Sequence, residues 1–149
     1  MIKKILALTI LATALFANSF DINSPIGSFE MTDQFDKKHT VDANVKTIIV
    51  SFEKDTSAHI NEFLETQEAG FLEDNNTVFI ADISGMPSLI TKIFALPKMK
   101  KYNYNILLIT DEEDKRFLHK EELLTVYKLE NGVITTVEYA TKADIPTLF

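Results

Sequence analysis

The chain has 149 residues, no cysteine and a formal net charge of −7, which fits a single domain of ordinary globular composition. The absence of cysteine excludes disulfide bonds, thiolate metal sites and any catalysis by a thiol. The negative charge argues against nucleic acid or an anionic membrane as the main partner.

The N-terminus has the pattern of a secretory signal peptide. Lys3 and Lys4 precede an uncharged run over residues 5–16. This run is too short for a helix that crosses a hydrocarbon core of about 30 Å. We therefore expect export to the periplasm of a Gram-negative bacterium. An uncleaved membrane anchor is the alternative.

Small residues define the expected cleavage point. Ala17 and Ser19 precede a cut that leaves Phe20 as the first mature residue, and a cut after Ala17 is the alternative. No cysteine follows the apolar run, which excludes a lipid anchor. Membrane contact is expected only through the signal peptide. The expected layout is a signal peptide over 1–19, a linker over 20–27, a folded domain over 28–142 and a C-terminal tail over 143–149.

Three strands and a helix are expected in the first half of the mature chain. The third strand is apolar or β-branched almost throughout, which is typical of a central strand covered on both faces. Oxygens of Asp55, Thr56 and Ser57 are suited to cap the next helix, which apolar residues at helical spacing extend to Leu72. The predicted strands span residues 28–32, 38–41 and 47–52.

The second half alternates strands with one more helix. This helix is expected to begin at Pro87 and to kink or end at Pro97. Asn131 and Gly132 lie between two alternating runs and predict a tight hairpin turn. The predicted strands span 78–83, 106–109, 123–129 and 133–139, and the apolar face of the helix consists of Leu89, Ile90, Ile93 and Phe94. This order favours an α/β sandwich with a mixed sheet.

Five segments carry short motifs in a characteristic order. Residues 32–41 are similar to a DQ-x-G-K-x-x-x-L opening, and residues 46–52 to a GK-x-v-v-l-x-F strand. Residues 54–59 fall where T-x-x-C stands at a helix start. Residues 105–111 are similar to an f-p-l-l-s-D strand, and residues 125–132 to a t-f-l-i-d-x-d-G hairpin. Together these motifs resemble the peroxiredoxin branch of the thioredoxin-like superfamily.

The resemblance implies a thioredoxin-like three-layer sandwich with a central mixed β-sheet, over roughly residues 28–140. The chain departs from the family where its chemistry lies. The peroxidatic cysteine falls at His59, the usual cis-proline is missing from residues 121–124, and the only arginine, Arg116, does not match the catalytic arginine. Thiol peroxidation and disulfide exchange need a thiolate, so we expect a scaffold without these activities.

Thr56, Ser57 and His59 are the candidate binding residues. They are expected in the first turn of a helix, where free N–H groups and the helix dipole favour anions. This turn is predicted to bind a small anionic ligand or a partner carboxylate. In the alternative interpretation, the two hydroxyls only cap the helix and His59 is a solvated surface residue.

Other candidate sites have weaker patterns. No metal site is predicted, because the imidazole and thioether groups that could hold copper lack short ligand spacing. These groups are His39, His59, His119, Met31, Met86 and Met99.

The acids over residues 111–114 could attract Ca²⁺, but a solvated loop is favoured. Asn75 begins an Asn-x-Thr glycosylation motif in an expected exposed turn.

A lysine cluster is the last candidate surface. Lys98, Lys100 and Lys101, beside Tyr102 and Tyr104, could meet an acidic partner or a phosphate, although lysines near a helix C-terminus also satisfy the dipole. No Gly-x-Ser-x-Gly elbow, dinucleotide fingerprint or P-loop is present, so a nucleotide site is not expected.

Together these patterns predict an exported, non-redox thioredoxin-like domain that binds a periplasmic protein or a small ligand. An enzyme is not expected, and no cofactor is predicted. One alternative is an accessory protein that uses a bound flavin or metal for redox or electron transfer. The other is a structural envelope protein.

Overall fold

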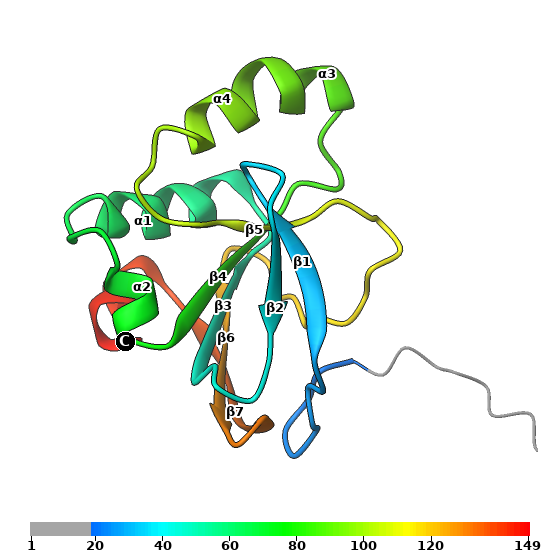
Figure 1. Cartoon of the computed structure of the whole chain (residues 1–149), viewed down its shortest axis with the longest axis vertical. Coiled ribbons are helices and arrows are strands. Elements are labelled where there is room, and N and C mark those ends of the chain that lie inside the picture. The colour runs from blue at the N-terminus through cyan, green and yellow to red at the C-terminus, as the bar shows by residue number, and fades with distance from the viewer. Residues whose placement is uncertain (1–18) are drawn as a thin grey trace, which may run out of the picture.

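The computed structural model describes residues 19–149, so the predicted signal peptide, apart from Ser19, lies outside the described residues. Seven strands form one mixed sheet in the order β2-β1-β5-β4-β3-β6-β7 (Figure 1). The three central strands β5, β4 and β3 run parallel, and the other pairs are antiparallel. The strands are β1 Phe29–Asp33, β2 Lys38–Val41, β3 Thr47–Ser51, β4 Thr77–Asp82, β5 Leu107–Ile109, β6 Leu124–Glu130 and β7 Val133–Ala140.

The helices lie on one side of this sheet (Figure 1). They are α1 Lys54–Leu64, α2 Phe71–Asp74, α3 Ser88–Ile90, η1 Thr91–Ala95, α4 Leu96–Met99 and η2 Lys142–Thr147. A core cluster that includes Ile49, Ile60 and Phe79 joins them to the sheet. No helix of the described residues has the length and apolar character needed to cross a membrane.

Irregular chain covers the opposite face of the sheet. Phe20 and Ile26 are buried in a second core cluster there, together with Phe117 from the segment between β5 and β6. The amide of Phe20 donates to the carbonyl of Arg116 at 2.7 Å, and that of Ile26 donates to Gly132 at 2.9 Å. Residues 20–27, predicted as a linker, therefore pack on the domain, because their apolar side chains cover a sheet face on which no described helix lies.

The first helix differs from its prediction at both ends. It begins at Lys54 with Glu53 as N-cap, and no side chain caps it. It ends at Leu64 rather than at Leu72, which belongs to the separate helix α2. Gly70 lies between them with a φ of 87°, a left-handed conformation that a continuous helix does not allow. Apolar spacing alone did not reveal this break.

The segments α3, η1 and α4 form one continuous helical stretch over residues 88–99, which we call the crossover helix. Pro87 is its N-cap rather than its first residue. Pro97 does not end it, because η1 is a π-helical turn in which the Leu96 amide donates to the carbonyl of Thr91. Proline lacks an N–H and crowds the carbonyl four residues before it, and a widened turn relieves this crowding.

The C-terminal tail folds back onto the helical face. Ile145 and Leu148 are buried in the core cluster beneath α1. The ring of Phe149 stacks on Phe63 with 5.3 Å between centroids. The predicted hairpin is also present, with φ angles of 50° at Asn131 and 78° at Gly132, as a tight turn between twisted strands requires.

Candidate functional site

The junction between β3 and α1 lies at the carboxyl end of the central parallel strands. Phe52 and Glu53 connect the two elements, and the segment before β6 passes beside them. The imidazole of His119 stacks on the Phe52 ring with 4.3 Å between centroids. Its Nε2 lies 3.1 Å from Oε1 of Glu53, which also accepts the Glu122 amide at 3.0 Å. The Glu53 carboxylate therefore links the β3–α1 junction to the segment before β6 through His119 and Glu122.

Electrostatics favour the charged form of Glu53. The amide of Glu122 and the imidazole of His119 hold the pKa of this carboxyl below its ordinary value. Glu122 has a φ of 63°, an uncommon conformation that presents its amide to the carboxylate. The contact involves residues 121–124, the segment from which the resemblance finds the family's cis-proline missing, and none of the described peptide bonds is cis. No hydroxyl of the described residues hydrogen-bonds the His119 imidazole.

The hydroxyls predicted to bind an anion are engaged inside the protein. Thr56 is buried, and its Oγ1 donates to the carbonyl of Glu53 at 3.0 Å. Ser57 Oγ lies 2.6 Å from Ser51 Oγ. Neither side chain caps the helix as expected, because the helix begins before them. An anion at this turn would have to compete with both contacts.

His59 is only half-buried, whereas Thr56, three residues before it on α1, is buried. It lines a shallow groove of about 240 Å³ with Phe63 and the η2 residues Ile145 and Pro146. The ion pair between Glu62 and Lys142, at 2.9 Å, borders the same groove. Neither Thr56 nor Ser57 lines this groove. Ligand binding at Thr56, Ser57 or His59 stays a prediction.

The three histidines have separate surroundings. His39 Nε2 contacts Asp33 Oδ2 at 2.6 Å, whereas His59 and His119 lie in the places described above. Met31 is the cross-strand partner of His39; Met86 and Met99 pack against the helical core. Within residues 19–149, no group of three or more His, Cys, Asp or Glu side chains is arranged to hold a metal ion.

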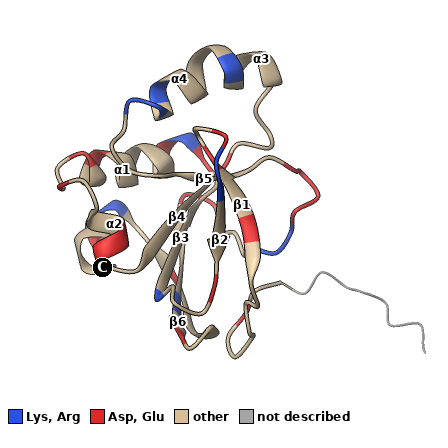
Figure 2. Cartoon of the chain, viewed as in Figure 1, with Lys and Arg blue, Asp and Glu red and all other residues tan. Residues whose placement is uncertain are grey.

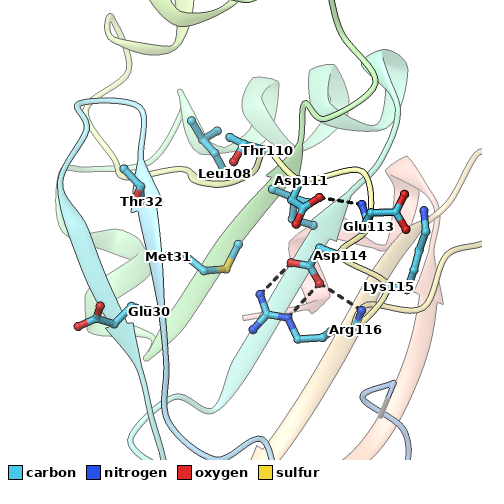
Figure 3. A pocket seen from close by; sticks show the side chains of 11 residues that line it. Glu30, Met31, Thr32, Leu108, Thr110, Asp111, Glu113, Asp114, Lys115 and Arg116 are labelled. Atoms are coloured by element: carbon cyan, nitrogen blue, oxygen red, sulfur yellow. Dashed lines mark hydrogen bonds and ion pairs between the residues drawn. The ribbon is translucent and has the colours of Figure 1, made fainter. Parts of the chain in front are cut away.

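The acidic run after β5 borders a cavity of about 440 Å³ between β1 and the segment that follows β5 (Figure 3). Both carboxylate oxygens of Asp114 accept from the guanidinium of Arg116, at 2.9 and 2.8 Å. This pairing lowers the pKa of Asp114. The guanidinium also lies 4.8 Å from the centre of the Phe29 ring. These contacts give Arg116 a structural role on the irregular face.

The lysine cluster and the glycosylation motif differ in part from expectation. Lys98, Lys100 and Lys101 are exposed, but Tyr104 is buried and its hydroxyl donates to Asn61 at 2.7 Å. Asn75 is half-buried rather than exposed, since its Nδ2 donates to the carbonyl of Phe71 at 2.8 Å. Glycosylation at Asn75 stays a prediction and would require loss of this bond.

The crossover helix carries an apolar surface that the described part of the chain leaves largely exposed. No residue of the helix is buried. Leu96 and Met99 are partly buried on its core side. The opposite side, which we call the exposed apolar face, consists of Leu89, Ile90, Ile93 and Phe94, which are 64%, 41%, 53% and 64% exposed. Sequence periodicity had identified these four residues as the apolar face of the helix.

Comparison with known proteins identifies the fold. The chain is similar to the thioredoxin domain of a thiol-disulfide oxidoreductase from Bacteroides vulgatus, with 15% identity, a TM-score of 0.56, and coverage of 87% of this chain and 96% of that one. A peroxidoxin from Mycobacterium tuberculosis has 10% identity and a TM-score of 0.56, with coverage of 86% and 92%. An uncharacterized thioredoxin-like protein from Porphyromonas gingivalis has 18% identity and a TM-score of 0.52, with 88% of both chains covered.

These likenesses confirm the predicted α/β thioredoxin-like fold with a mixed sheet. In the expected three-layer sandwich, the layer on the second face of the sheet is irregular chain rather than helix among the described residues. No protein-family model and no curated protein matches the chain. At these identities the solved structures share the fold alone. The chain has that fold without the cysteines on which thiol chemistry depends.

Proposed function

We propose that this cysteine-free thioredoxin-like chain is an exported module of the periplasm that works by binding a protein partner. Its full sequence holds no thiol, and disulfide exchange and thiol peroxidation both require a thiolate. The lysine-led apolar run before Phe20 supports export. The activities named for the solved relatives therefore do not transfer, whereas the scaffold does.

The observation that carries this proposal is the exposed apolar face of the crossover helix. Single exposed apolar residues are ordinary on a protein surface, but a contiguous group marks an interaction site. Here four large side chains lie on consecutive turns of one helix, and each is at least 41% exposed. A helix that is apolar on both sides is expected to be buried on both sides. A partner protein would supply the missing contact.

The test uses the full chain at its natural level in its source cells. Extracts are separated by size-exclusion chromatography, and the chain is followed by immunoblotting. We expect wild type to elute in a complex larger than the 16.9 kDa chain, and Ile93→Asp to elute at the position of the isolated chain. A charge in the centre of the face would prevent apolar contact without disturbing the core.

A matched control separates this surface from general effects of the substitution. Ile22 is 52% exposed and Ile93 is 53% exposed, but Ile22 lies in the N-terminal segment. Ile22→Asp should leave the complex intact. A wild-type chain that elutes alone, or a complex that survives Ile93→Asp, would contradict the proposed function.

A further inference from the structure

The charged residues of the segment that carries the exposed apolar face all have one sign. Residues 83–110 contain four lysines and no aspartate or glutamate, in a chain with a net charge of −7. All four lysines are exposed, and Figure 2 shows basic but no acidic residues on the crossover helix. They are Lys92, Lys98, Lys100 and Lys101. The face is therefore an apolar surface with a basic border on an otherwise acidic domain.

The lysines beside the exposed apolar face limit which class of partner can bind to it. In a symmetric dimer through the face, the same patch of each copy would meet the other, so lysines would lie near lysines with no acid from residues 83–110 between them. An anionic lipid surface would attract the lysines but repel the excess of acids over the rest of the chain. A protein surface with apolar side chains among acidic ones meets neither difficulty.

We propose that the partner of the crossover helix is a segment of another protein that combines large apolar side chains with aspartate or glutamate. This inference rests on the binding function proposed above and specifies the chemistry of the partner. The apolar side chains of the segment cover Leu89, Ile93 and Phe94, and its carboxylates pair with the lysines at the C-terminal end of the helix. Charge complementarity of this kind gives specificity and faster association.

The test places a photocrosslinking amino acid at position 94 of the full chain in its source cells. Phe94 is 64% exposed, so the replacement leaves the fold intact. The crosslinked segment is then sequenced. We expect a segment of another protein that contains large apolar residues and more acids than bases. A crosslink to a second copy of this chain, to lipid, or to a basic or uncharged segment would overturn the inference.

Charge reversal provides the second readout. Lys98→Glu, Lys100→Glu and Lys101→Glu together should reduce the crosslink yield by about tenfold, because attraction at the border becomes repulsion. The control reverses three exposed lysines elsewhere, Lys46, Lys54 and Lys115, and should leave the yield unchanged. A yield that survives the first triple change overturns the inference while leaving the binding function intact. Absence of any crosslink in wild-type background counts against the binding function itself.

Discussion

Two helical segments, α1 and the crossover helix, lie on the same side of the sheet but differ in how many of their side chains are buried (Figure 1). The first buries Ile60 and Leu64 in the core. The second buries no residue and exposes Leu89 and Phe94. Apolar content therefore does not predict burial in this domain. Helix α1 completes the core, whereas the crossover helix has apolar side chains that the domain leaves largely exposed.

The crossover helix is attached mainly at its C-terminal end. The buried side chain of Gln34 donates from Nε2 to the carbonyls of Met99, at 3.3 Å, and Tyr104, at 2.8 Å. Its Oε1 accepts the amide of Ile106 at 2.8 Å. Gln34 thus links the β1–β2 turn to residues 99–106, at and after the C-terminal end of the crossover helix. The N-terminal part of the helix has no comparable buried polar anchor among the described residues.

The largest difference in the free energy of unfolding is expected between Ile60→Ala and Ile93→Ala, which make the same substitution on the two helices. Ile60 is 0% exposed and Ile93 is 53% exposed. Loss of the buried side chain should lower the free energy of unfolding by about 2–5 kcal/mol. The exposed change should stay within about 0.5 kcal/mol. Urea unfolding monitored by circular dichroism measures both, and similar losses would refute the comparison.

Asp33 should make a pH-dependent contribution to the stability of the turn that carries Gln34. Burial acts to raise the pKa of this carboxyl, but hydrogen bonds from His39 and from the amides of Lys37 and Phe35 together hold it below its ordinary value. Because the folded pKa is depressed, the stabilisation is present above the unfolded pKa of about 3.9 and is lost as the pH falls through the folded value.

Asp33→Asn tests this contribution. At pH 7 the variant should lose about 1.5–3 kcal/mol of unfolding free energy, since hydrogen bonds to a charged group are lost. The difference from wild type should shrink as the pH falls below the unfolded pKa. Urea unfolding at a series of pH values measures it. A difference that is constant with pH would show that the charge of Asp33 does not matter.

Gln34→Leu should lower the free energy of unfolding less than Ile60→Ala does, and it should loosen mainly the crossover helix. Removal of the amide leaves a buried carbonyl and a buried amide without partners, at a cost of about 1–3 kcal/mol. Amide exchange should accelerate over residues 96–106 more than in α1. Equal acceleration in both helices would mean that Gln34 supports the whole domain and is not a local anchor.

Much of the fold could be predicted from the sequence because strands and turns leave local patterns. The central strands, the hairpin at Asn131 and Gly132, and the order of elements are present as predicted, with ends that differ by one or two residues. The break between α1 and α2 was missed, because the apolar spacing continues to Leu72 although α1 ends at Leu64 and α2 begins after Gly70. The packing of residues 20–27 was missed because a sequence does not show that a sheet face has no helix over it.

The candidate site was less predictable because its contacts join distant parts of the chain. Glu53 and His119 are 66 residues apart and come from segments without periodic patterns. The position of Glu53, directly after the central strand, was the available signal, since polar residues at carboxyl ends of parallel strands often form sites. The sequence predicted the exposed apolar face as a face, but only the structure showed that no described element covers it.

Hydrogen–deuterium exchange of the isolated chain and of its native complex tests the central claim most directly. In the isolated chain, amides of α1 should exchange slowly and those of residues 88–95 quickly, because local openings cost least where little is buried. In the complex, protection should rise over residues 88–101 and stay unchanged at the β3–α1 junction. Protection that rises at residues 52–59 instead, with residues 88–101 unchanged, would contradict the assignment of the crossover helix as the binding surface.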